Sequence, residues 1–337
     1  MSKRTNYVNA AVFVSVSVLL GACGGGGGGG DGGGNVTASS APVTISVANA
    51  KEVAAASYKT TAGLEGGGSG ATGFLTGAVT QTVSPRIHLV DVLMSQVKNI
   101  PQLASANPAA ALTGVVVSET IACTNSGSIS ITFDDADNNQ QLSTGDSMSF
   151  NASNCTEDGM IMNGSVSINN VSVSGDPLSA PHSMQLSIQA NNFTVTEGVE
   201  SIALNGGMTM AESTNDGVLF THSITGSSIQ VTEGGVSAGL SNFSIEAAED
   251  DNTLAYTLDL NATVSSPELG GSVTIVTDTV FAGIEPNEPS SGQATITGAN
   301  NSRVTLIAMG ADNVRLEIDE DGNGTAETFV DTTWGAL

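Results

Sequence analysis

The chain has 337 residues, of which 33 are acidic and 8 are basic, so its formal net charge is −25. No lysine or arginine occurs between Lys98 and Arg303, a stretch that holds 22 acidic residues. Nucleic-acid binding depends on neutralising phosphates with lysine and arginine, so we expect no nucleic-acid partner. Docking of this acidic body on an anionic lipid surface is disfavoured for the same reason.

Residues 1–22 are typical of a secretory signal peptide. Lys3 and Arg4 give a basic start, and an apolar run over residues 10–20 follows. That run is too short to cross a bilayer as a stable helix, which needs about 20 apolar residues. The signal ends in the sequence LGAC at residues 20–23, directly before a run of glycines.

The LGAC ending resembles the lipobox of bacterial lipoproteins, which has a leucine three places before the cysteine and two small residues between them. The resemblance implies cleavage after residue 22 and acyl chains, such as palmitate, on Cys23. In that family an aspartate directly after the cysteine retains the protein in the inner membrane, whereas Gly24 stands there in this chain. The resemblance therefore implies an outer-membrane lipoprotein, at the periplasmic face or the cell surface. The alternative is an ordinary signal peptide with a chance cysteine.

Residues 23–34 are predicted to be a lipid-bearing cysteine followed by a flexible tether. Glycine is the most permissive residue for backbone angles, which suits a chain leaving a membrane surface. Residues 35–112 are predicted to be a helical and loop segment. Within it, the alanine-rich residues 46–59 indicate a short helix, and residues 85–100, which are apolar on most sides and bounded by prolines, indicate a buried helix.

From 113 to 337 the chain alternates Ser, Thr, Asn and Gly with apolar residues, which is typical of strands with one buried face. Turn signals separate about thirteen such strands, and pairs such as Asn-Asn shift the alternation by one residue, as β-bulges do. A weak echo links MNGSVSI at 162–168, LNGGMTM at 204–210 and LGGSVTI at 269–275, which we interpret as a repeated hairpin start. The predicted fold is mainly β. We expect a large curved antiparallel meander, a soluble half-barrel or sandwich-like sheet, with one or two short N-terminal helices packed on it, the 85–100 helix inside its curve.

If Cys23 carries lipid, Cys123 and Cys155 remain, and two cysteines in an exported chain predict a disulfide. Alternating apolar residues at 129–133 and 148–150 indicate a hairpin whose open end brings the two cysteines together. Cys155 is out of step with that alternation, so one bulge within 151–154 is required. The alternative is a pair of free thiols with a catalytic or metal-binding role.

The acidic connection of this hairpin resembles a calcium loop in its spacing. Oxygen-bearing residues suited to Ca²⁺ recur over twelve positions, at Asp135, Asp137, Asn139, Gln141, Ser143 and Asp146. Two departures are Gln140 where glycine is usual and Asp146 where a longer glutamate is usual. The alternative is a polar hairpin loop, in which Asp and Asn are favoured without any metal.

A second, weaker metal candidate comprises Asp319, Asp321, Asn323 and Glu327. Its twelfth position would be Val330, which cannot ligate a metal, and a tight turn explains its glycines equally well. No other cofactor is expected.

The pattern G-x-S-x-G occurs only as GVSAG at 235–239, inside the region of alternating strands rather than at a strand-to-helix turn. H-E-x-x-H does not occur, and His88, His182 and His222 lie far apart in the sequence. We therefore expect a protein that is not an enzyme and has a structural or binding role at the cell envelope. Two alternatives stay open. One is a carrier or sensor of an apolar ligand inside a half-barrel, and the other is an unrecognised hydrolase, since the members of a catalytic triad need not be neighbours in sequence.

Overall fold

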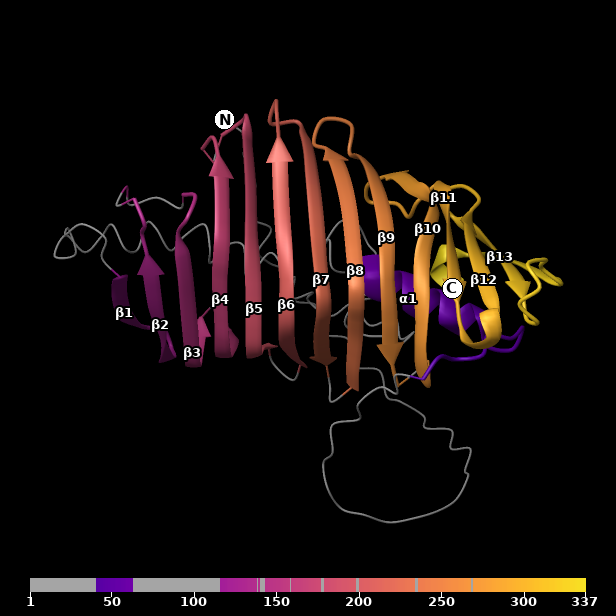
Figure 1. The fold of residues 1–337 in the computed structure, drawn as a ribbon, viewed down its shortest axis with the longest axis horizontal. Helices are drawn as coiled ribbons and strands as arrows, with labels where there is room; N and C mark the ends of the chain where they lie inside the picture. The colour runs from indigo at the N-terminus through magenta and orange to yellow at the C-terminus, as the bar shows by residue number, and fades with distance from the viewer. Residues whose placement is uncertain are drawn as a thin grey trace, which may run out of the picture. The chain divides into compact units, whose positions relative to one another are not determined.

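The computed structural model describes residues 41–62, 116–137, 139, 143–157, 159–176, 179–197, 200–233, 236–267 and 269–337. The strands in these ranges form one antiparallel sheet of fourteen strands, arranged in the order in which they occur along the chain (Figure 1). The predicted mainly-β curved meander with a short helix is thereby confirmed. The predicted signal, lipid site and tether, together with the helix expected at 85–100, lie outside the described residues.

Each strand pairs with the strand before it and the strand after it, without any crossover. The middle strands are the longest. The bounds are β1 (Val116–Ala122), β2 (Ser126–Asp134), β3 (Ser147–Glu157), β4 (Met160–Ser174), β5 (His182–Glu197), β6 (Glu200–Thr214), β7 (Leu219–Glu233), β8 (Val236–Asp250), β9 (Ala255–Ser266), β10 (Gly271–Ile284), β11 (Ser291–Thr297), β12 (Arg303–Ala308), β13 (Asn313–Asp319) and β14 (Thr328–Thr333).

The apolar core lies on one face of this sheet. In β9, Leu258, Leu260 and Val264 are buried while the residues between them are more exposed, and β12 alternates in the same way. Successive side chains of a strand point to opposite faces, so the alternation in the sequence divides the sheet into a core face and an outer face rich in Ser and Thr.

A line of bulges crosses the long strands near their middles. The register shifts between Ala152 and Cys155, between Ala190 and Phe193, and between Ser241 and Ser244 as successive strand pairs are followed. A bulge bends a strand and increases its twist. The predicted slips in alternation at Asn-Asn pairs are therefore confirmed as β-bulges.

Asparagine and glycine build this line of bulges. Asn154 and Asn192 have positive φ angles of 46°, a region that asparagine tolerates better than most residues. The backbone N–H of Asn154 donates to the side-chain oxygen of Asn163 at 2.8 Å, and that of Asn192 donates to Asn205 at 2.6 Å. The residue after each acceptor is a glycine. The echoes MNG and LNG therefore mark bulge contacts within strands rather than hairpin starts, whereas the third echo, LGG at 269–271, does lie at the turn that begins β10.

Helix α1 (Ala50–Ala62) packs inside the curve of the sheet and contacts β8 to β13. Most of its side chains are buried, and small alanines allow the strands to approach closely. Tyr58 makes ring contacts with Phe281 of β10 at 5.3 Å and with Trp334 at 4.9 Å between ring centroids. Trp334 begins the 3₁₀ turn η4 (Trp334–Ala336), and another such turn, η3 (Ala299–Asn301), precedes β12. The described helix within the curve is thus the predicted 46–59 segment, shifted by a few residues.

Turns of a meander alternate between the two ends of its sheet. We call the end with the turns after even-numbered strands the even end, at the top of Figure 1, and the opposite end the odd end. Residues 41–45 enter at the odd end, where the Val43 N–H donates to the Ser272 carbonyl at 2.9 Å and the Ala299 N–H donates to the Val43 carbonyl at 2.7 Å.

Candidate functional site

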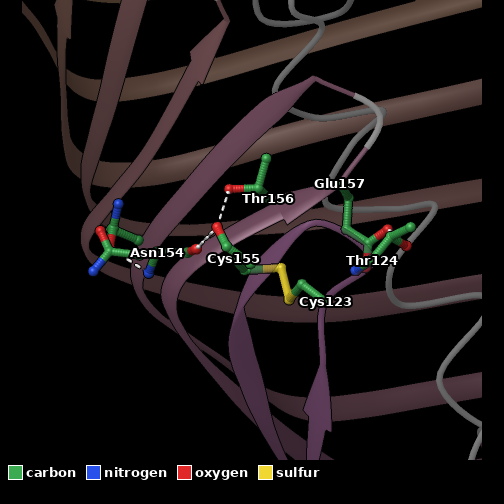
Figure 2. Close-up of a disulfide and its surroundings, with 8 residues drawn as sticks. Cys123, Thr124, Asn154, Cys155, Thr156 and Glu157 are labelled. Carbon is green, nitrogen blue, oxygen red and sulfur yellow. Dashed lines mark hydrogen bonds between the residues drawn. A yellow bond between two sulfur atoms is a disulfide. The ribbon is translucent and has the colours of Figure 1, made fainter.

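Cys123 and Cys155 form a disulfide, as predicted, with sulfur atoms 2.03 Å apart and Cα atoms 5.4 Å apart. Cys123 follows β1 and Cys155 lies in β3, so the bond ties the β1–β2 turn to the third strand (Figure 2). Asn154, the bulged residue beside Cys155, provides the change in alternation that this geometry requires. Because thiolates are the ligands that metals use, the bonded pair offers no metal site.

A second set of contacts holds the same corner. The carboxylate of Glu157 accepts hydrogen bonds from the backbone N–H of Thr124 at 2.9 Å and from its hydroxyl at 2.6 Å (Figure 2). The N–H of Asn125 donates to the Thr156 carbonyl at 3.1 Å. Together with the disulfide, these bonds make the corner at the odd end of β1, β2 and β3 a firmly connected part of the sheet.

The first predicted calcium loop lies at the even end, between β2 and β3. Carboxylate oxygens of Asp135, Asp137 and Asp146 lie within 4.8 Å of one another, and Asp135 and Asp146 are buried. Asp146 accepts hydrogen bonds from the N–H of Ala136 at 2.9 Å and of Ser143 at 2.6 Å. The sequence therefore identified three carboxylates that the fold does bring together.

The remaining predicted ligands of this loop differ in their placement. The N–H of Asn139 donates to Asp135 at 3.1 Å and to Asp137 at 3.2 Å, and its side-chain amide donates to Asp137 at 2.9 Å. The Ser143 hydroxyl donates to Asp146 at 3.0 Å. Gln141 lies outside the described residues.

The second predicted loop, between β13 and β14 at the odd end, repeats this arrangement. The N–H of Asn323 donates to Asp319 at 3.1 Å and to Asp321 at 3.0 Å, and the side-chain amide of Asn323 donates to Glu327 at 3.3 Å. Oxygens of Asp319, Asp321 and Glu327 also lie within 4.8 Å of one another. Both loops thus share an Asp-x-Asp-x-Asn turn, in which the backbone N–H of the asparagine donates hydrogen bonds to both aspartate carboxylates.

Arg303 forms an ion pair in the second loop. Its Nε atom lies 3.0 Å from the Asp319 carboxylate. Burial raises the pKa of Asp319, but hydrogen bonds from the Gly324 and Gly322 N–H groups and the charge of Arg303 outweigh that effect, so the pKa is lowered. An arginine therefore already balances the buried carboxylate of the second loop.

A hollow of about 610 Å³, which we call the outer groove, crosses β4 to β10 on the outer face of the sheet. Small side chains such as Ser183, Ser213 and Thr221 line it, with the longer Glu246 and Asp259 beside them. These residues alternate with the buried ones in each strand, which places the groove opposite the core. Sequence reasoning missed this groove, because it depends on which strands become neighbours.

Sequence reasoning also missed a cluster of Glu212 with two histidines. His182 Nε2 lies 3.1 Å from the Glu212 carboxylate and His222 Nδ1 lies 4.0 Å from it. Glu212 and His222 are register partners, and they point to the same face as the buried Met184 and Ile224. Glu212 and His222 also border the outer groove, but the alternation of their strands directs their side chains toward the rim of the core. Only the strand register, which the sequence does not state, brings these residues together.

No protein-family model matches the chain, and no curated protein and no solved structure matches it either. Within the ranges that the structure describes, no helix has the length and hydropathy needed to cross a membrane.

Proposed function

We propose that this chain is a lipoprotein of the bacterial outer membrane, moored through acylated Cys23, whose β domain has a non-enzymatic structural or binding role at the cell envelope. The observation that carries the proposal is the LGAC sequence at residues 20–23, placed between an apolar signal and a glycine tether. The Cys123–Cys155 disulfide supports it, because disulfides form and persist in exported proteins and are rare in the cytosol.

Replacing Cys23 by serine tests the anchor. We expect the wild-type chain to be found in the membrane fraction and the Cys23→Ser variant to lose its acyl chains and move to the soluble fraction, measured by fractionation and intact mass. The variant Cys123→Ala/Cys155→Ala, which keeps Cys23, serves as the control and should remain membrane-bound. A Cys23→Ser protein that still pellets with membranes contradicts the proposed anchor.

The two alternative functions find less support in the geometry. An apolar carrier requires a cavity lined by apolar side chains, whereas the outer groove is lined largely by Ser, Thr and acidic residues. A hydrolase requires a histidine and a carboxylate whose side chains meet in a cleft. Glu212 and His222 border the outer groove, but strand alternation directs their side chains toward the rim of the core. We therefore retain the structural or binding role as the proposal.

Calcium at the first loop stays a prediction, and the difference between the loops makes it testable. We expect calcium to give a binding heat in calorimetric titration that is lost in Asp137→Ala, because three carboxylates in close proximity favour a divalent cation. The matched variant Asp321→Ala in the second loop should keep that heat, because Arg303 already neutralises Asp319. Absence of binding in the wild type, or loss of the heat only in Asp321→Ala, contradicts this assignment.

A further inference from the structure

Leu254 adopts a backbone conformation that bulky residues avoid. The described residues include seven non-glycine positions with positive φ, and six of them are asparagine. The seventh is Leu254, at φ 58° in the turn between β8 and β9. Asparagine would fit this position at less conformational cost, and the Leu254 side chain is 50% exposed, so core packing does not account for its presence.

Leu254 belongs to a row of exposed apolar residues on adjacent turns of the even end. The row, which we call the tip patch, consists of four of the large apolar residues that the fold leaves about half exposed, namely Leu219, Leu254, Ile284 and Met309. Backbone hydrogen bonds join their turns. The Asp251 N–H donates to the Val218 carbonyl at 3.0 Å, the Glu285 N–H to Leu254 at 2.9 Å, and the Gly310 N–H to Ser290 at 3.0 Å.

Leu219 and Ile284 of the tip patch lie on the same face of the sheet as the outer groove. Leu219 lies two residues from Thr221, which lines the groove, so both side chains point outward. Ile284 lies two residues from Ala282, the register partner of Thr257, which also lines the groove. An elongated polypeptide segment can therefore contact the apolar tips and the groove together.

The surroundings of these two features are strongly acidic. Glu246 and Asp259 line the groove. Asp216 and Asp250 lie in the turns next to Leu219 and Leu254. Hydrogen bonds from the Leu219 and Val218 N–H groups lower the pKa of Asp216, and those from Thr253 and Asn252 lower the pKa of Asp250. These two carboxylates therefore keep their negative charge in mildly acidic surroundings. An apolar patch within negative charge favours a partner of opposite sign and disfavours anionic lipid or a second copy of this acidic chain.

We propose that the tip patch and the outer groove together form a docking surface for a polypeptide segment that carries both apolar side chains and lysine or arginine. The apolar side chains of the segment cover the tips, with Leu254 held outward by its turn, and its cationic groups pair with the carboxylates along the groove. Such pairing sets partner choice and association rate, and it weakens as salt screens the charges.

The test uses the full chain carrying Cys23→Ser, so that acyl chains do not contribute to binding. The probe is a fluorescent helical peptide of leucine and lysine, compared with the same peptide carrying glutamate in place of lysine. We expect Leu254→Asn to fold with unchanged or higher thermal stability and to bind the lysine peptide about fivefold more weakly, from the loss of a half-buried leucine contact. The matched control Ile161→Asn, which alters an apolar residue 39% exposed near the odd end, should leave the affinity unchanged.

Three results overturn the proposal. The first is equal binding of the lysine and glutamate peptides, and the second is equal weakening by Leu254→Asn and Ile161→Asn. The third is a Leu254→Asn variant that binds the lysine peptide as well as the parent protein does but loses a different interaction. That interaction would be binding to vesicles of phosphatidylcholine and phosphatidylglycerol, or concentration-dependent self-association in ultracentrifugation. An approximately fivefold loss specific to the lysine peptide and to Leu254→Asn supports it.

Discussion

The Gly164→Ala variant is expected to lose about 3 to 5 kcal/mol of unfolding free energy, among the largest effects for a single methyl group in this sheet. Gly164 has φ +90°, and a Cβ atom there would lie 2.0 Å from the backbone oxygen of Asn192 on the next strand. That contact lies on the line of bulges, so relieving it requires the two strands to separate there. Urea unfolding followed by circular dichroism measures the loss.

Gly159→Ala is the matched control for this prediction. Gly159 has a similar φ of +87°, but no heavy atom lies within 4 Å of a Cβ placed there. We expect it to cost only about 1 to 2 kcal/mol from the backbone conformation. Equal losses in the two variants would mean that the close approach of Gly164 to Asn192 does not contribute to stability.

Removing the disulfide is expected to cost about 3 to 4 kcal/mol, because the bond closes a loop between cysteines that are 32 residues apart. The variant Cys123→Ala/Cys155→Ala should therefore unfold at a clearly lower urea concentration than the wild type, and reduction of the wild-type protein should shift its midpoint by a similar amount.

Thr124→Ala separates the disulfide from the contacts around it. This variant loses the hydroxyl that donates to Glu157 but keeps the sulfur bond, so we expect a loss of only about 1 kcal/mol. If the double alanine variant unfolds at the wild-type midpoint, the disulfide adds nothing to stability and the prediction fails.

Most of the fold could be predicted from the sequence, because its contacts are local. Each strand pairs with its neighbour in the chain, so alternation and turn residues determine the topology without long-range information. The disulfide followed from the same logic, including the bulge beside Cys155. The helix inside the curve could not be chosen in this way. Residues 46–59 and 85–100 were both predicted to be helices, and only packing against residues such as Phe281 and Trp334 identifies the first as one that the sheet surrounds.

Some candidate sites likewise follow from local sequence, whereas others depend on which strands pair. The acidic loops are hairpin connections, so spacing alone brought Asp135, Asp137 and Asp146 together. The balancing of Asp319 by Arg303 depends on the pairing of β12 with β13, and the contact of Glu212 with two histidines depends on three strands in register. Leu254 carries no signal in the sequence, because its significance lies in a backbone angle.

The strand order also gives the molecule a nearly one-dimensional architecture, in which stability spreads by nearest-neighbour contacts, as in repeat proteins. Helix α1 supports β8 to β13, which leaves β1 as a terminal strand far from that support and prone to fray. The disulfide lies at this edge of the sheet and covalently links the end of β1 to β3. Partial unfolding that begins at the β1 edge must therefore detach β1, β2 and β3 from the sheet together.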